Sequence, residues 1–244
     1  MALNNATLSR YRALARLQYV GYCETDVQTW TCGICRDAAS PIKNTTRVSQ
    51  FSAMARWGVT SFGMVGVSHD LGRTFVVFQG AIHRIEWLRC YEYFQKVPKE
   101  IGVPDPIRVH SGFYKSYREV RAQVVNELLE KSRLYPQYPI TILGHSYGGA
   151  LASLLALDIA KGNLRKLFDP SRVELITFGS PRVGNAAYAE AMNKAKWHNL
   201  VRLVHTTDVF VHLPPRAPAL GIFADAKYLI RQACRMCITE EKPG

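Results

Sequence analysis

Residues 144–148, Gly-His-Ser-Tyr-Gly, form a G-x-S-x-G pentapeptide, the arrangement in this chain best suited to chemistry. A serine at its centre is typical of a nucleophile on a sharp turn from a strand into a helix, where the glycines leave room that Cβ atoms would fill. Such a serine attacks an acyl carbonyl and forms a covalent acyl-serine intermediate. Because so short a motif also arises by chance, an incidental serine in glycine-rich packing is the alternative, and the flanking elements decide between the two.

The segments on both sides of the pentapeptide have the required patterns. Residues 140–143 are a short apolar run that predicts a strand, and residues 150–160 are apolar on nearly every side, as in a helix buried against a sheet. The N-terminus of that helix would stabilise the oxyanion that forms when Ser146 attacks. The sequence therefore favours a nucleophile turn over incidental packing.

Strands and helices alternate along the rest of the chain. The expected elements are a helix at 7–19 with Thr7 as its cap, an irregular polar segment at 24–50, a hairpin of 62–67 and 74–78, an amphipathic helix at 111–133, a strand at 173–178, a helix near 186–195 and a strand at 200–204. This order predicts an α/β fold, with a mostly parallel central sheet flanked by helices. Functional residues are then expected at the carboxyl ends of the strands.

Composition limits the class of protein and its partners. With 244 residues and no repeat or linker, the chain is expected to form one domain over 1–244, in which 1–50 is an N-terminal helix and a cysteine-containing segment. The net charge of +12 favours anionic partners, but the basic residues are scattered and form no nucleic-acid motif, so no nucleic acid is expected. No apolar run is long enough for a transmembrane segment, and the first residues show no signal peptide.

Several further motifs carry a family resemblance. In chain order they are Trp30-x-Cys32-x-x-Cys35, residues 109–117, Gly144-His-Ser146, residues 177–185 and residues 208–215. In this combination the chain resembles the fungal-type class 3 lipases. The resemblance implies an α/β-hydrolase fold, an extracellular location, no metal or cofactor, and hydrolysis of carboxylic esters such as triacylglycerols through an acyl-serine.

The resemblance also assigns roles to four residues. Ser146 corresponds to the nucleophile and Asp208 to the acid that orients the base of a catalytic triad. Ala81 and Tyr147 correspond to the residues whose backbone N–H groups form the oxyanion hole. The segment 78–81 reads Phe-Gln-Gly-Ala where the family has F-R-G-S/T, so Ala81 lacks the hydroxyl of its counterparts, and Gln79 replaces an arginine. Losing one oxyanion donor costs on the order of 10²–10³ in rate.

The general base is missing from this assignment. The family supplies a histidine in a C-terminal strand, whereas the sole histidine after Asp208 is His212, in a segment that matches a non-catalytic family element. The other histidines match non-catalytic positions or lie in turn, lid and loop contexts; they are His69, His83, His110, His145, His198 and His205. The match decays over 216–244, as expected of a truncated or divergent C-terminus. We therefore expect only feeble ester hydrolysis, with two alternatives open: a catalytically silent relative that binds lipid or a partner in the same cleft, and a feruloyl-type esterase.

Residues 82–94 lie where these lipases carry a lid. The segment is rich in aromatic residues, namely Trp87, Tyr91, Tyr93 and Phe94, and also contains Cys90, for which we have no role. An amphipathic lid covers the site in water and opens at a lipid surface, so the expected partners are a lipid or other ester substrate and, transiently, a lipid interface. Aromatic residues fixed in the core are the alternative.

Two C-x-x-C pairs, Cys32/Cys35 and Cys234/Cys237, admit three interpretations. They are a zinc site built from both pairs, unpaired thiols, and a Cys32–Cys35 disulfide with Cys23 joined to a C-terminal cysteine in an oxidising compartment. The resemblance implies the Cys32–Cys35 disulfide.

Overall fold

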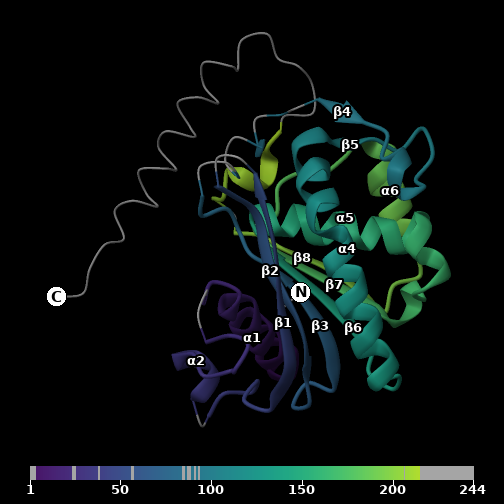
Figure 1. Cartoon of the computed structure of the whole chain (residues 1–244). Helices are drawn as coiled ribbons and strands as arrows, with labels where there is room; N and C mark the ends of the chain where they lie inside the picture. The colour runs from purple at the N-terminus through teal and green to yellow at the C-terminus, as the bar shows by residue number, and fades with distance from the viewer. Residues whose placement is uncertain are drawn as a thin grey trace.

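A six-stranded sheet forms the centre of the computed structural model, which describes residues 4–23, 26–37, 39–55, 58–83, 86, 89–90, 92, 94–205 and 207–214. The strand order is β1-β2-β3-β6-β7-β8 (Figure 1). The strands are Thr45–Ala55 (β1), Gly58–Ser68 (β2), Arg73–Phe78 (β3), Ile140–His145 (β6), Val173–Phe178 (β7) and Asn199–Leu203 (β8). β3, β6, β7 and β8 run parallel, whereas β1 and β2 form antiparallel pairs beside β3. The predicted α/β fold is confirmed.

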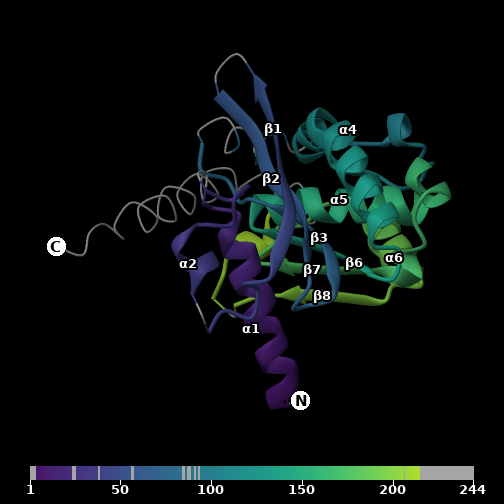
Figure 2. The same ribbon diagram turned by 60° about the horizontal axis from the view of Figure 1, so that its bottom comes forward.

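Helices cover both faces of the sheet, because successive side chains of its buried strands point to opposite sides and both sides are apolar. In β3, Val76 and Phe78 belong to one core, and Phe75 and Val77 belong to the other. The first core lies under α4 (Ser111–Leu134), α5 (Tyr147–Lys161) and α6 (Ala186–Lys194), and the second under α1 (Asn5–Val20) and α2 (Gly33–Arg36) (Figures 1 and 2). No helix in the described ranges has both the length and the apolarity of a bilayer span.

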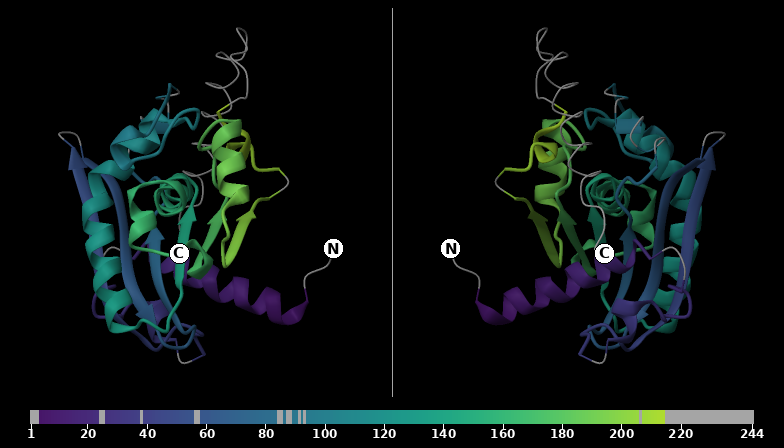
Figure 3. Two further views of the ribbon diagram at one scale, coloured as in Figure 1. Left: turned by 90° about the vertical axis from the view of Figure 1, so that its right-hand side faces the viewer. Right: turned by 90° about the vertical axis from the view of Figure 1, so that its left-hand side faces the viewer.

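An ion pair fastens α1 to the sheet. Arg10 donates to both carboxylate oxygens of Glu174 at 2.6 and 2.5 Å, and Asn199 donates to the same carboxylate at 2.9 Å. Burial raises the pKa of Glu174, but these hydrogen bonds and the charges of Arg10 and Arg73 together outweigh burial, so the pKa lies below its ordinary value. Figure 3 shows the first turns of α1 extending past the β8 edge of the sheet.

A second buried carboxylate joins α4 to α5. Asp158 is fully buried and accepts hydrogen bonds from the Tyr117 hydroxyl at 2.8 Å and from Arg121 Nε at 2.6 Å. Its other oxygen accepts the amide of Leu164, just beyond α5, at 3.2 Å. These bonds fix α5, the helix that begins directly after Ser146, against α4.

Several local predictions are wrong. The segment 24–50 is not irregular throughout, because α2 lies within it and β1 begins at Thr45. Among the described strands, β1 pairs with β2 alone, and an edge strand tolerates the polar residues that concealed it. The cap of α1 is Asn4, whose side chain accepts the amide of Thr7 at 2.8 Å, so Thr7 lies inside the helix. The short elements β4 (Gln95–Lys96), β5 (Val109–His110), η1 (Lys99–Ile101), η2 (Asn163–Lys166), η3 (Pro170–Arg172) and η4 (Phe210–His212) have no expected counterpart.

The other expected elements are present with shifts of a few residues at their ends. Residues 216–244, for which we expected a divergent C-terminus, lie outside the described residues. One domain over 1–244 stays a prediction.

Candidate active site

Ser146 lies on a strained turn between β6 and α5. Its backbone has φ 51° and ψ −122°, a conformation that residues other than glycine rarely adopt. The glycines around Ser146 are necessary because a larger residue would collide with the backbone. A Cβ on Gly144 would lie 2.3 Å from the carbonyl oxygen of Gly148, and a Cβ on Gly148 would lie 2.3 Å from the carbonyl oxygens of Phe78 and Gln79. The strand-to-helix turn expected at 144–148 is therefore present, and it makes Ser146 the N-cap of α5.

Asp208 lies at the same edge of the sheet. It follows the end of β8, and its Oδ1 accepts the amide of Phe210 at 2.9 Å. Gly179, at the end of β7, has φ 57°, and a Cβ there would lie 3.1 Å from Asp208 Oδ2. Because the amide of Ser146 bonds to the carbonyl of Phe178 at 2.8 Å, the ends of β6, β7 and β8 meet here. The structure brings Ser146 and Asp208 to one edge of the sheet.

Ala81 and Tyr147 each present a backbone amide at this edge. Tyr147 is the first residue of α5, and amides in the first turn of a helix have no carbonyl partner within that helix. The amides of residues 79, 80, 82 and 83 all donate to oxygen atoms of the protein. The amide of Ala81, between them, has no partner among the residues that the structure describes, so it is available to an oxyanion.

Gln79, where the resemblance implies an arginine, is a buried polar residue. Its side chain is buried, and neither its amide nitrogen nor its carbonyl oxygen has a hydrogen-bond partner in the described part of the chain. A buried amide without partners destabilises the folded state.

Histidines approach this edge, but none has the contacts of a general base. The hydroxyl of Tyr22 lies 2.5 Å from His145 Nδ1. Desolvation lowers the pKa of His145, and the charge of Asp208 partly opposes this. His110 is buried at the start of α4, where desolvation lowers its pKa to about 4. Over the described ranges no histidine hydrogen-bonds to the Asp208 carboxylate or to the Ser146 hydroxyl. The base stays unassigned.

Tyr22, His145 and Glu86 have contacts here that the sequence does not indicate. Tyr22 is 123 residues away from His145 in the chain, and no spacing pattern links them. Glu86 is buried beside residues 78–81, the predicted oxyanion segment, and its carboxylate accepts the backbone amides of Ile82 and His83. No signal in the sequence points to Glu86, because the burial of an acidic residue is not visible in a sequence.

The predicted lid segment is partly described. Arg89 is buried and forms an ion pair with Glu119 of α4 at 3.1 Å, and Cys90 packs against the core beneath it. Phe94, at the end of the segment, is 84% exposed. Trp87, Tyr91 and Tyr93 lie outside the described residues. The choice between a lid and fixed core residues stays a prediction.

Of the three interpretations of the cysteines, the disulfide interpretation is confirmed for Cys32 and Cys35. Cys32 and Cys35 form a disulfide with an S–S distance of 2.02 Å, so these sulfurs are not zinc ligands. Cys23 carries a free thiol among the described residues, and its expected disulfide with a C-terminal cysteine stays a prediction. Cys234 and Cys237 lie outside the described residues.

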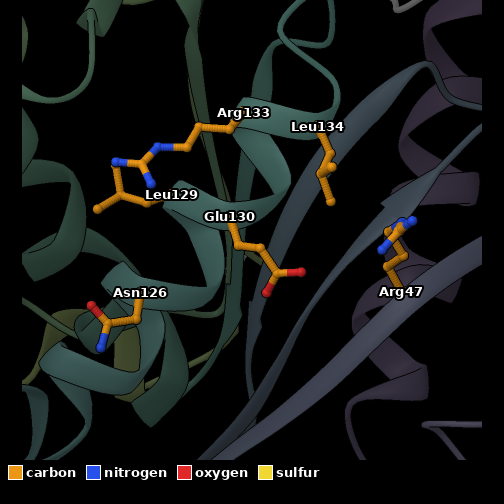
Figure 4. A pocket seen from close by; sticks show the side chains of 6 residues that line it. All are labelled: Arg47, Asn126, Leu129, Glu130, Arg133 and Leu134. Carbon is orange, nitrogen blue, oxygen red and sulfur yellow. The ribbon is translucent and has the colours of Figure 1, made fainter.

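A hollow of about 600 Å³ between β1 and α4 is separate from this edge (Figure 4). In Figure 4, Glu130 extends from α4 toward the strand that carries Arg47. The other lining residues are Asn126, Leu129, Arg133 and Leu134. None of the four residues assigned by resemblance lines this hollow.

Comparisons with known proteins agree with the geometry. A family model described as Lipase (class 3) matches residues 75–217. The chain is 30% identical to a lipase of Rhizomucor miehei over 201 residues, which cover 80% of this chain and 51% of the relative. It is 33% identical over 152 residues to the secreted mono- and diacylglycerol lipase A of Penicillium cyclopium, with coverages of 62% and 46%. It is 31% identical over 218 residues to phospholipase A1-II 1 of Oryza sativa subsp. indica, with coverages of 80% and 52%. The chain spans about half the length of the curated relatives it matches.

Solved structures share the fold. A fungal lipase in complex with an inhibitor has a TM-score of 0.76 at 27% identity, with 88% of this chain and 77% of that chain covered. A triacylglycerol lipase whose catalytic centre is described as a serine protease triad has a TM-score of 0.74 at 27% identity, with the same coverages of 88% and 77%. The family match covers more than half of the 244 residues. The chain therefore belongs to the class 3 lipase family.

Proposed function

We propose that this protein hydrolyses carboxylic esters of lipids, acylglycerols foremost, through an acyl-serine intermediate on Ser146. One observation carries the proposal: Ser146 has φ 51° between the end of β6 and the N-terminus of α5. A strained backbone at a serine is costly to maintain and is typical of functional sites. Relatives named as lipases support the same reaction class.

In the proposed reaction, Ser146 Oγ attacks the carbonyl carbon of the ester while its proton passes to a base. The carbonyl oxygen becomes a tetrahedral oxyanion, to which the amides of Ala81 and Tyr147 donate. Collapse of this intermediate expels the alcohol, which takes the proton from the base, and water then attacks the acyl-serine in the same way. Asp208 orients the base and stabilises its cationic form.

The exposed apolar residues around the site support a transient contact with a lipid interface. Ile82 and Phe94 bound the predicted lid segment, and Val204 and Val209 flank Asp208; all four are exposed. Exposed apolar side chains suit a lipid surface better than water. We also propose an extracellular location, which the name of the secreted Penicillium relative and the Cys32–Cys35 disulfide support.

Complementation by imidazole tests the hydrolase. Hydrolysis of p-nitrophenyl butyrate is followed near neutral pH for the parent chain and for Ser146→Ala, each with and without added imidazole. We expect slow hydrolysis without imidazole, because no histidine in the described part of the chain hydrogen-bonds to the Asp208 carboxylate and because Ala81 lacks a hydroxyl. Imidazole should accelerate the parent chain beyond its effect on Ser146→Ala, since it can take the proton from Ser146.

Two other outcomes have clear meanings. Rapid hydrolysis without imidazole that Ser146→Ala abolishes would keep the hydrolase and refute the prediction of feeble turnover. Equal rates for both proteins in all conditions would refute the hydrolase.

A second candidate is a catalytically silent protein that binds lipid in the same cleft. Ala81 and the unassigned base favour it. Equal hydrolysis rates, together with saturable binding of both proteins to diacylglycerol-containing micelles, would support this candidate instead.

A further inference from the structure

The amide of Ala81 is held from its C-terminal side by Glu86. One carboxylate oxygen of Glu86 accepts the amides of Ile82 and His83, at 2.7 and 2.8 Å. The Glu86 side chain is fully buried, so these charge-assisted hydrogen bonds are shielded from water. The backbone that follows Ala81 is thereby fixed by a group inside the predicted lid segment.

The amide of Ala81 is held from its N-terminal side by Tyr22. The amide of Gly80 donates to the Tyr22 hydroxyl at 3.0 Å. A Cβ on Gly80 would lie 2.3 Å from that hydroxyl oxygen, so only glycine permits this approach. Tyr22 lies just beyond α1, an element with no other described part in the proposed reaction.

Tyr22 also joins the oxyanion segment to the nucleophile turn. Because its hydroxyl accepts the Gly80 amide, its own proton is free to be donated to His145 Nδ1, which lies 2.5 Å away. The two rings meet edge-on, with centroids 6.0 Å apart. Burial raises the pKa of Tyr22 to about 12, so the phenol keeps the proton that it donates. His145 immediately precedes Ser146, and this chain of bonds therefore runs from Gly80 to the nucleophile.

We propose that Tyr22 is a positioning residue for ester hydrolysis, which fixes the Ala81 amide relative to Ser146 by bridging Gly80 and His145. This inference rests on the proposed function. Oxyanion donors act only at about 2.7–3.1 Å from the developing charge, and misplacement by about 1 Å costs roughly 10²-fold. The demand is greater here because Ala81 offers an amide and no hydroxyl.

The test compares Tyr22→Phe with the matched control Tyr19→Phe in the full chain. Tyr19 is one turn earlier in α1 and 62% exposed, whereas the Tyr22 hydroxyl carries both bonds. The first readout is the pseudo-first-order rate at which a p-nitrophenyl phosphonate ester modifies Ser146, followed by mass spectrometry with imidazole present. The second is hydrogen exchange of the Gly80 amide, which needs no activity.

Tyr22→Phe should slow phosphonylation roughly tenfold to hundredfold, with the half-saturating inhibitor concentration unchanged, and should speed exchange at Gly80 about fivefold or more. Tyr19→Phe should match the parent in both. The double variant Tyr22→Phe/His145→Ala should be no slower than the slower single variant, because the two residues act as one unit.

Unchanged phosphonylation in Tyr22→Phe overturns the positioning role even if exchange at Gly80 rises. Unchanged exchange overturns the bridge itself. If the parent chain reacts no faster at Ser146 than denatured protein does, the proposed function fails instead, and the exchange measurement still decides whether the bridge exists.

Discussion

Replacing Gly148 with alanine is expected to destabilise the protein and displace the oxyanion segment. The new Cβ would lie 2.3 Å from the carbonyl oxygens of Phe78 and Gln79, about 1 Å inside ordinary contact at 3.4 Å. Both obstacles are backbone atoms, which cannot turn away as a flexible side chain would. β3 and α5 must therefore separate.

The expected magnitude follows from two opposed effects. Overpacking of this kind costs about 1–3 kcal/mol, and two backbone contacts put Gly148→Ala at or above the upper end. Alanine regains up to ~1 kcal/mol because Gly148 lies within α5. The net loss of about 2 kcal/mol corresponds to a fall in Tm of about 4–8 °C for a chain of this size.

Thermal denaturation followed by circular dichroism measures this effect, with Gly33→Ala as the control. Gly33 is also helical, but a Cβ there would meet nothing within 4 Å. Gly33→Ala should be neutral or slightly stabilising. If Gly148→Ala melts within about 2 °C of the control, the reasoning that this turn admits no Cβ is wrong.

Three further predictions concern buried polar groups. Because its folded-state pKa is depressed, the Glu174 carboxylate contributes stability that is fully present above its unfolded pKa of about 4.3 and is lost as the pH falls through the lower folded-state pKa. Urea titrations should show the parent more stable than Glu174→Gln at pH 7, with the difference closing as the pH falls below about 4; a difference that grows toward low pH would contradict this. Asp158→Ala should cost about 2–4 kcal/mol in chemical denaturation, because it leaves the buried Tyr117 hydroxyl and the Leu164 amide without their acceptor and removes the partner of the partly exposed Arg121; a loss below about 1 kcal/mol would show that water replaces the carboxylate. Gln79→Met should stabilise by up to about 1–3 kcal/mol, because it removes two buried atoms without partners, and a lower Tm would show that Gln79 has a role in the folded protein.

The parts of the fold that could be predicted are those with a strong local pattern. The run 140–143 is apolar and precedes a glycine-rich turn, and the structure has β6 and α5 there. β1 could not be predicted, because an edge strand buries little surface and its polar residues interrupt the alternation of apolar and polar side chains that marks a strand. The cap at Asn4 was missed because Asn4 and Thr7 both suit an N-cap and only the hydrogen bond at 2.8 Å distinguishes them.

The candidate site likewise has a part that could be predicted from local sequence and a part that could not. The turn at Ser146 follows from glycines that are adjacent in sequence, so its geometry was predictable. The approach of Tyr22 to His145 is a tertiary contact between segments 123 residues apart. One tyrosine among twelve carries no local signal of such a contact. The base was not predictable from the residues present, and the described histidines leave it unassigned.

The most direct test of the account is to identify the residue that receives the acyl group. The chain is mixed with p-nitrophenyl butyrate, quenched in acid and digested, and the butyrylated peptide is sequenced by mass spectrometry. We predict a butyryl group on Ser146 in the native protein and none at this position after prior denaturation. Butyrylation of another residue, at the same level in the parent chain and in Ser146→Ala, with Ser146 unmodified, would contradict it.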